Sequence, residues 1–160
     1  MSFDIPPIDD LHDEALLAEL RRRIDSKTVP QGALGGLAQL VERLGLTLGS
    51  SAPQLRDPQL IVFAADHGIA QQGVSAYPSD VTAQMVVNFL AGGAAVSVLA
   101  RQHGIAQTVV DCGVRSDFDP APGLLLCKIA PGTADSSVGP AMTAEQCTQA
   151  LRQGAQLLAD

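Results

Sequence analysis

A polar turn follows directly on an apolar run in the segment "VFAADHGIAQQGVSAYP", residues 62–78. The run stops at Asp66 and His67, whose carboxylate and imidazole could work as an acid–base pair or ligate a metal ion. A structural interpretation stands beside these, in which Asp66 accepts backbone N–H bonds in a tight turn and His67 hydrogen-bonds a neighbouring loop. Because no third ligand follows at metal-like spacing, we predict no metal site.

The same stretch carries the one tyrosine of the chain. Pro78 favours an extended backbone at Tyr77, and this conformation could aim the ring into a pocket. With Ser75 and Gln84 as hydrogen-bonding groups, Tyr77 would form one wall for a flat, mostly apolar heterocycle. Alternatively, Tyr77 packs the loop down. Met85 suits the core, although flexible thioethers also line aromatic pockets.

Two further turns of small and polar residues end apolar runs, at residues 111–113 ("DCG") and 130–133 ("APGT"). The second leads toward a helix N-terminus, which could receive an anion, but the segment lacks the lysine and the spacing of a P-loop. In open parallel sheets, ligands bind beyond the carboxyl ends of the strands. We therefore predict that these two turns meet residues 66–68 in one site.

These turns require strands to position them, and the sequence predicts three, at 59–65, 106–114 and 123–130. The first, "QLIVFAA", is a short continuous apolar run, typical of a strand covered on both faces. A helix is expected from Ser79 or Asp80, either of which can cap it, to Gln102. Gly92 and Gly93 indicate a close contact with the sheet or a break into two helices. A strand, a helix and a strand in this order predict parallel neighbours.

Helices are expected on both sides of this unit. One is predicted from a cap at Asp9 or Asp10 to about Asp25, and one over 33–44, ended by Gly45. The segment 143–146, "TAEQ", matches a capping box and opens a helix predicted to reach Asp160.

Together the elements predict an α/β fold, three-layer with a mostly parallel, Rossmann-like sheet. Residues 1–58 form an N-terminal helical segment and linker, and residues 59–160 form the βαβ-containing unit.

Composition narrows the function classes. A hydrophobic content of 46% in 160 residues excludes a disordered chain. A net charge of −7, with basic residues clustered only at 21–23, argues against nucleic-acid binding. Three widely spaced cysteines fit neither a disulfide framework nor a zinc site, and indicate a reducing cytoplasm. The apolar region 86–100 is shorter than the ~20 residues of a membrane span, so we expect no membrane insertion.

The chain resembles the nicotinate-nucleotide–dimethylbenzimidazole phosphoribosyltransferase family of cobalamin biosynthesis. The resemblance rests on residues 63–104, "FAADHGIAQQGVSAYPSDVTAQMVVNFLAGGAAVSVLARQHG", with support from "DCGV", "KIAPGT…GPAMT" and "IPPID". The segment "VPQGALGGL" is similar to the family's K-P-P-G-S-L-G-R-L. Its Val29, Gln31, Ala33 and Gly36 replace lysine, proline, serine and arginine.

The resemblance implies transfer of phosphoribosyl from nicotinate mononucleotide to 5,6-dimethylbenzimidazole, yielding α-ribazole 5′-phosphate and nicotinate. It implies no cofactor, and a homodimer. The resemblance implies that the base pocket is lined by the residues at the matching positions, Ser75, Tyr77, Pro78, Gln84 and Met85. The floor of the pocket would be shaped by Asp66, His67 and Asn88.

Family members run to roughly twice this length. Their glycine-rich phosphate-binding segment, of the G-E-M-G-I-G-N-T type, and their general-base glutamate would lie beyond Asp160. We therefore expect no catalytic residue in this chain and a sheet incomplete relative to the full family fold, with an exposed edge and an uncovered apolar face. Alone, the chain is expected to be inactive.

Two alternatives belong to other functional classes. One is a non-catalytic azole-binding module, or a half-enzyme that needs a partner chain. The other is a metal-dependent hydrolase that uses Asp66 and His67.

Overall fold

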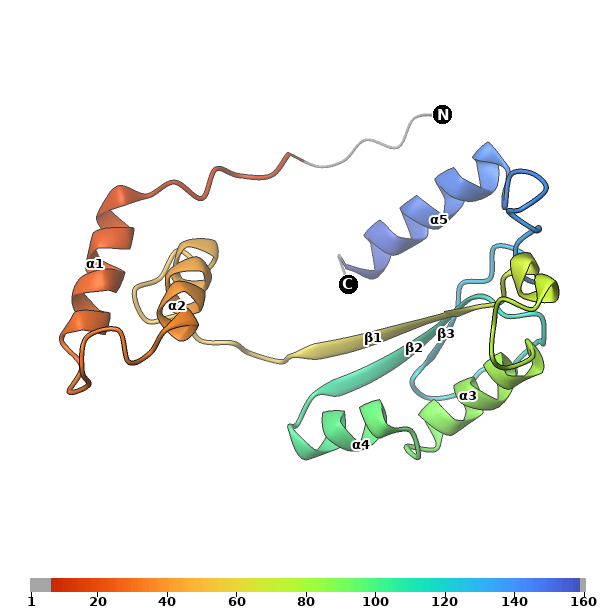
Figure 1. The fold of residues 1–160 in the computed structure, drawn as a ribbon, viewed down its shortest axis with the longest axis horizontal. Coiled ribbons are helices and arrows are strands. Elements are labelled where there is room, and N and C mark those ends of the chain that lie inside the picture. The colour runs from red at the N-terminus through yellow and green to blue at the C-terminus, as the bar shows by residue number, and fades with distance from the viewer. Residues whose placement is uncertain (1–6, 159–160) are drawn as a thin grey trace. The chain divides into compact units, whose positions relative to one another are not determined.

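The computed structural model describes residues 7–158. The chain divides into a helical unit within Ile5–Arg56 and an α/β unit that contains Asp57–Asp160 (Figure 1). Each unit is described by itself.

The helical unit pairs α1 (Glu14–Asp25) with α2 (Gly36–Thr47). Asp13 caps α1, because its Oδ1 accepts a hydrogen bond from the backbone N–H of Leu16 at 2.8 Å. The predicted cap at Asp9 or Asp10 is therefore wrong. Asp10 instead accepts from the backbone N–H of His12 at 3.0 Å, a local turn that precedes the helix.

The second predicted helix is shifted along the chain. Gly45, expected to end it, lies inside α2. The side chain of Leu20 is 1% exposed and packs against this glycine, where a Cβ would meet the Leu20 Cδ1 at 2.5 Å. At the other end, Gly35 has a φ of +50°, so the chain cannot be helical before Gly36. A packing contact between helices thus overrides the usual role of glycine as a C-cap.

The α/β unit contains a parallel sheet in the order β1-β2-β3, formed by Gln59–Ala65, Ala106–Gly113 and Leu124–Leu126. The predicted strand at 59–65 and the parallel pairing of the first two strands are confirmed. The predicted strand at 123–130 is shorter than expected. β2 has an irregularity against Ala64 and Ala65, and its regular ladder with β3 ends at Leu126, although Ile129 still donates its backbone N–H to the Cys112 carbonyl at 3.0 Å.

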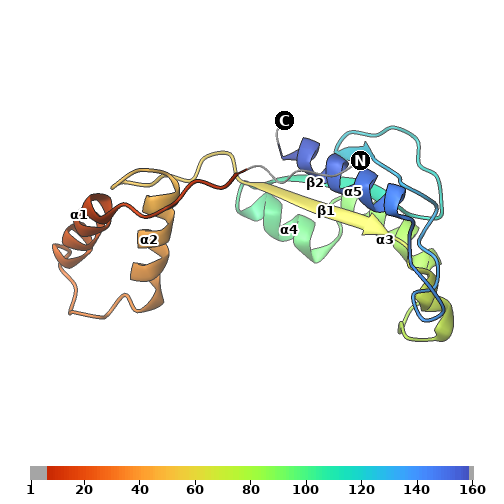
Figure 2. The ribbon, with the colours of Figure 1, turned by 90° about the horizontal axis from the view of Figure 1, so that it is seen from above.

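Helices lie on both sides of the sheet (Figures 1 and 2). α3 (Asp80–Leu90) and α4 (Ala95–Gln102) pack on one face, and α5 (Ala144–Leu157) lies on the other. Of the two alternatives at the paired glycines, the structure shows the break, with Gly92 at a φ of +74°. Ser79 is the N-cap residue of α3, one of the two positions predicted. Its backbone is already helical, however, and its side chain makes no capping hydrogen bond in the described chain.

The core lies on the α3 side of the sheet, where Ala64, Val109 and Leu124 pack against Val86. The opposite face is partly open. Phe63 of β1 is 57% exposed and Leu125 of β3 is 40% exposed. The prediction that β1 is covered on both faces is therefore wrong, and the expected uncovered apolar face is present.

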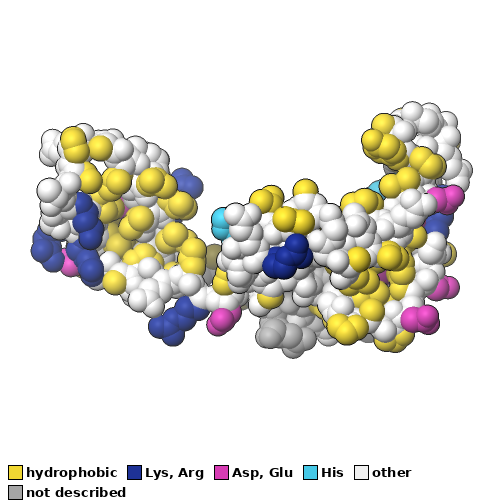
Figure 3. Space-filling view, turned by 90° about the horizontal axis from the view of Figure 1, so that it is seen from below, with side chains coloured by type: hydrophobic (Ala, Val, Ile, Leu, Met, Phe, Trp, Pro, Cys, Tyr) yellow, Lys and Arg dark blue, Asp and Glu magenta, His cyan; other side chains and the backbone are white. Residues whose placement is uncertain are grey.

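Hydrophobic side chains also gather on the outer surface over α3 and α4, as Figure 3 shows for the face seen from below. The exposed ones on these helices are Val87, Val98 and Leu99. Residues Asp80–Gln102 are long and apolar enough to cross a membrane by length and composition alone, with a mean hydropathy of 1.6. In the structure this stretch is two short helices that pack on the sheet, and each is shorter than the ~20 residues of a span.

The capping box of α5 is confirmed. Thr143 Oγ1 accepts from the backbone N–H of Gln146 at 3.2 Å, and the Gln146 side chain accepts from the backbone N–H of Thr143 at 2.9 Å. The helix is described to Leu157, and the predicted end at Asp160 lies outside the described residues.

Candidate functional site

The three turns after the strands meet at Asp66, as predicted. The backbone N–H of Asp66 donates to the Gly113 carbonyl, and its own carbonyl accepts from the N–H of Thr133, both at 3.0 Å. The Oδ2 of Asp66 accepts from the backbone N–H of Arg115 at 2.8 Å. Asp66 is 4% exposed and joins the turns after β1, β2 and β3 into one surface.

Glycine permits the close approach of the first and third turns. A Cβ on Gly68 would lie 2.5 Å from the carbonyl carbon of Ala134 and 2.7 Å from the Thr133 carbonyl oxygen. The backbone N–H of Gly68 instead donates to Thr133 Oγ1 at 3.2 Å. On the other side, Gly132 has a φ of +87°, a left-handed conformation that glycine adopts without steric cost.

The second turn is held by Asp111, which is 1% exposed. Its Oδ1 accepts from the backbone N–H groups of Gly113 and Val114 at 3.0 and 2.8 Å. Its Oδ2 lies 3.5 Å from the ammonium of Lys128, which also binds Asp117 at 2.6 Å. This ammonium lowers the pKa of the exposed Asp117 carboxyl.

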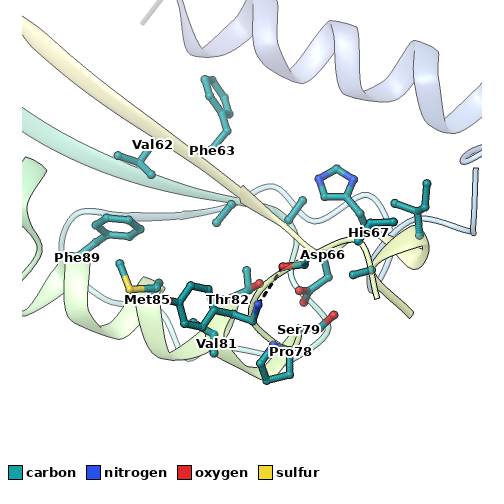
Figure 4. A pocket seen from close by; sticks show the side chains of 17 residues that line it. Val62, Phe63, Asp66, His67, Pro78, Ser79, Val81, Thr82, Met85 and Phe89 are labelled. Atoms are coloured by element: carbon teal, nitrogen blue, oxygen red, sulfur yellow. Dashed lines mark hydrogen bonds between the residues drawn. The ribbon is translucent and has the colours of Figure 1, made fainter. Parts of the chain in front are cut away.

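A pocket of about 530 Å³ opens beside these turns, between β1, α3 and the loop that contains the short 3₁₀ helix η1 (Gly68–Gln72). Its inner wall is apolar, and Figure 4 shows Met85 and Phe89 of α3 facing Val62 of β1. Hydroxyl groups at its wall come from Ser75, Ser79 and Thr82. The pocket therefore presents apolar surface to a flat ring and a few hydrogen-bonding groups to its edge.

Most of the predicted site residues line this pocket, namely Asp66, His67, Ser75, Tyr77, Pro78 and Met85. Tyr77 is 71% exposed at the pocket wall, so its ring does not pack the loop down. Ser75 Oγ accepts from the backbone N–H of Tyr77 at 3.3 Å, which leaves the Ser75 hydroxyl proton free to face a ligand. Their functional roles remain predictions.

Gln84 and Asn88 do not line the pocket, although the resemblance includes both. Helical residues advance by about 100° each, so Gln84 points to a different side of α3 from Thr82, Met85 and Phe89. Gln84 is exposed. Asn88 lies at the end of α3, where its carbonyl accepts from the N–H of Gly93 at 3.0 Å.

Sequence reasoning missed several pocket residues, among them Val62, Thr82 and Phe89. The signal was present in the sequence. Positions 82, 85 and 89 follow the i, i+3, i+7 spacing of a single helix face, and that face contains Met85. Val62 gave no comparable signal, because an apolar residue inside a buried strand is ordinarily core.

A smaller cavity of about 140 Å³ lies between the strand-end turns and α5. His67 lines it as well, together with Cys112, Thr133 and, from α5, Gln146. Burial raises the pKa of the Cys112 thiol, and neighbouring Cys127 and Asp111 raise it further. His67 thus lines both cavities.

Acidic side chains are scarce around the main pocket. Asp66 is the one carboxylate in its wall, and its Oδ2 is already hydrogen-bonded to Arg115. Among residues 7–158, no group of three or more His, Cys, Asp or Glu side chains could hold a metal ion. The described geometry thus offers binding surface rather than an obvious general base.

Comparison with known proteins identifies relatives over nearly the whole chain. Residues 10–160 match a family model described as "Phosphoribosyltransferase". The nicotinate-nucleotide–dimethylbenzimidazole phosphoribosyltransferase of Variovorax paradoxus is 64% identical over 154 residues, which are 96% of this chain and 44% of the relative. The enzyme of the same name from Cupriavidus necator is 57% identical, over 94% of this chain and 42% of its own length.

The fold has solved counterparts. A crystal structure of the enzyme of this name from Thermus thermophilus matches with a TM-score of 0.86 and 44% identity, over 91% of this chain and 44% of the other. The crystal structure of CobT from the same organism matches with a TM-score of 0.84 at 42% identity. The chain spans less than half the length of these relatives. On these matches, the chain belongs to the nicotinate-nucleotide–dimethylbenzimidazole phosphoribosyltransferase family.

Proposed function

We propose that this chain provides the base-binding part of an enzyme that transfers phosphoribosyl from nicotinate mononucleotide to 5,6-dimethylbenzimidazole. The products would be α-ribazole 5′-phosphate and nicotinate, in the synthesis of the lower ligand of cobalamin. The observation that carries the proposal is the pocket between β1 and α3, in a chain 64% identical to an enzyme named for this reaction.

The pocket suits a planar azole in size and chemistry. Its volume of about 530 Å³ falls within the range of ordinary small-molecule sites. Val62, Met85 and Phe89 offer apolar surface to the ring faces. The hydroxyl of Thr82 offers a hydrogen bond to a ring nitrogen.

In the proposed reaction, one benzimidazole nitrogen attacks the anomeric carbon of the ribose, and nicotinate leaves with the electrons of the broken bond. The second azole nitrogen gives its proton to a general base. Holding two flat rings on opposite sides of the sugar supplies much of the rate enhancement. Since Asp66 is engaged with Arg115, we assign to this chain the positioning of the azole. The general base and the phosphate site belong to the further length that relatives possess.

We also propose a cytoplasmic protein that forms a homodimer, uses small-molecule substrates and needs no cofactor. The exposed Phe63 and Leu125 on the sheet support an association that covers apolar surface.

Calorimetric titration of dimethylbenzimidazole into this chain and into the full-length Variovorax paradoxus relative tests the proposal. We expect weak binding to this chain and at least tenfold tighter binding to the relative, which has further chain to close the pocket. Absence of binding to both proteins, or equal affinity for both, would contradict it. A parallel assay of α-ribazole 5′-phosphate formation should detect product with the relative alone.

A further inference from the structure

Two cysteines lie close together at the end of the sheet, Cys112 in β2 and Cys127 directly after β3. β2 and β3 are in parallel register, with Val110 opposite Leu125 and Asp111 opposite Leu126. Cys112 is the next residue of β2, where Ala65 pairs with Gly113 and the ladder becomes irregular. The backbone N–H of Cys127 donates to the Asp111 carbonyl at 2.9 Å, so Cys127 lies directly beside the peptide bond that joins Asp111 to Cys112.

The two thiols lie near each other. Cys112 and Ile129 both line the small cavity under α5. Cys127 follows the last residue of β3 and precedes Ile129 by two residues. Between them, Lys128 reaches the buried Asp111. Cys127 is also a neighbour that raises the pKa of the Cys112 thiol.

The spacing of paired strands brings the two backbones within the range that a disulfide spans. Neighbouring strands lie about 4.8 Å apart. The Cα atoms of cysteines joined by a disulfide are typically about 4.4–6.8 Å apart, so no large backbone movement is needed to join Cys112 to Cys127. Both are free and half-buried, whereas the third cysteine, Cys147, is exposed on α5.

We propose that Cys112 and Cys127 form a redox-sensitive dithiol, which a small-molecule disulfide such as glutathione disulfide converts into an intramolecular disulfide. This site neighbours the azole pocket and does not depend on the proposed transferase reaction. Cys112 lines the small cavity together with Asp66 and His67, so the new bond would form directly beside the strand-end turns.

The chemistry balances as two thiol–disulfide exchanges. The Cys127 thiolate attacks one sulfur of the small disulfide, whose S–S bond breaks, and one small thiolate leaves. Cys112 then loses its proton to solvent and attacks the Cys127 sulfur, which releases the second small thiolate. Two cysteines are oxidised and one small disulfide is reduced to two thiols. Cys127 reacts first because burial raises the pKa of Cys112 and so lowers its thiolate fraction.

The test uses the 160-residue chain, reduced and then incubated with glutathione disulfide, with free thiols blocked by alkylation before peptide mass mapping. We expect a peptide pair joined through Cys112 and Cys127, and reversal by dithiothreitol. Among these three cysteines, Cys147 should be left outside the intramolecular bond. The matched control Cys147→Ser should give the same linked pair. Cys127→Ser should give none, with an unchanged circular dichroism spectrum to show that it is folded.

The peptide map of the wild-type chain tests the proposal even if a variant misfolds. Glutathione retained on Cys127 beside a freely alkylated Cys112 would overturn the proposal. So would full alkylation of both cysteines under conditions in which Cys147 has already exchanged.

Discussion

The Oδ2 of Asp66 accepts a hydrogen bond from the backbone N–H of Arg115 at 2.8 Å, across 49 positions of sequence. This bond ties the turn after β1 to the turn after β2, and it engages the one carboxylate in the wall of the pocket between β1 and α3. The structural alternative for Asp66, as an acceptor of backbone N–H bonds, is therefore what the geometry shows. Asp66 supports the shape of the site.

Replacing Asp66 should destabilise the fold by an amount that depends on whether the new side chain can still accept this hydrogen bond. Asp66→Ala removes a buried charged acceptor and should lower the free energy of unfolding by roughly 1–3 kcal/mol. Asp66→Asn keeps a carbonyl oxygen in place and should lose less. Urea unfolding followed by circular dichroism measures both. An Asp66→Ala variant as stable as wild type would contradict the structural role.

Gly68 should not tolerate a side chain. The Cβ of Gly68→Ala would meet backbone atoms of Ala134 at 2.5 Å, so the first and third turns must separate, at a cost of about 1–3 kcal/mol. Gly139→Ala is the matched control, since no atom lies within 4 Å of its added Cβ. Thermal unfolding of the two variants should differ clearly. Equal melting temperatures would show that the two turns do not touch as described.

The ion pair of Lys128 with the buried Asp111 should contribute more to stability than its ion pair with the exposed Asp117. Lys128→Met removes the ammonium that lies 3.5 Å from Asp111 Oδ2, and this buried charged oxygen has no hydrogen-bond partner among the described residues. We expect a loss of about 1–3 kcal/mol at neutral pH. Asp117→Asn should change stability far less, because exposed ion pairs contribute little. A larger effect for Asp117→Asn would reverse this ranking.

The ion pair with Lys128 also predicts a pH dependence. It lowers the pKa of Asp117 below the usual value near 3.8, so the carboxylate favours the folded state above that pH. As the pH falls through the lowered pKa, this contribution disappears. The small difference in stability between wild type and Asp117→Asn should therefore be present at about pH 6 and vanish in strong acid. Parallel unfolding curves that differ equally at both pH values would contradict the assignment.

Local chemistry made several elements predictable from the sequence. The run "QLIVFAA" matches β1 residue for residue, and the capping box at Thr143 and Gln146 opens α5 as expected. The capping bonds join residues three apart in sequence, and the apolar pattern of β1 is visible in its own residues, although its ladder bonds go to β2. The meeting of the three turns was also predictable, because parallel strands carry their carboxyl ends to one edge.

The predictions failed where distant residues decide the structure. Gly45 continues α2 because Leu20, in another helix, packs on it. Phe63 stays exposed because no element covers that part of the sheet in the described chain. Gln84, predicted as a hydrogen-bonding group beside Tyr77 and again from the resemblance, does not line the pocket, because the helix period that turns Met85 into the pocket turns Gln84 away from it.

The central claim is that a planar azole binds between β1 and α3, on the face of α3 that carries Thr82 and Met85. Its most direct test is an NMR titration of 5,6-dimethylbenzimidazole into the isotope-labelled chain and two tryptophan variants. Thr82→Trp fills the pocket, whereas Gln84→Trp places the same bulk on the exposed side of the same helix. The account predicts saturable shifts of the Thr82, Met85 and Phe89 amides in wild type, retained in Gln84→Trp and lost in Thr82→Trp. Loss of binding in Gln84→Trp with full binding in Thr82→Trp would contradict it.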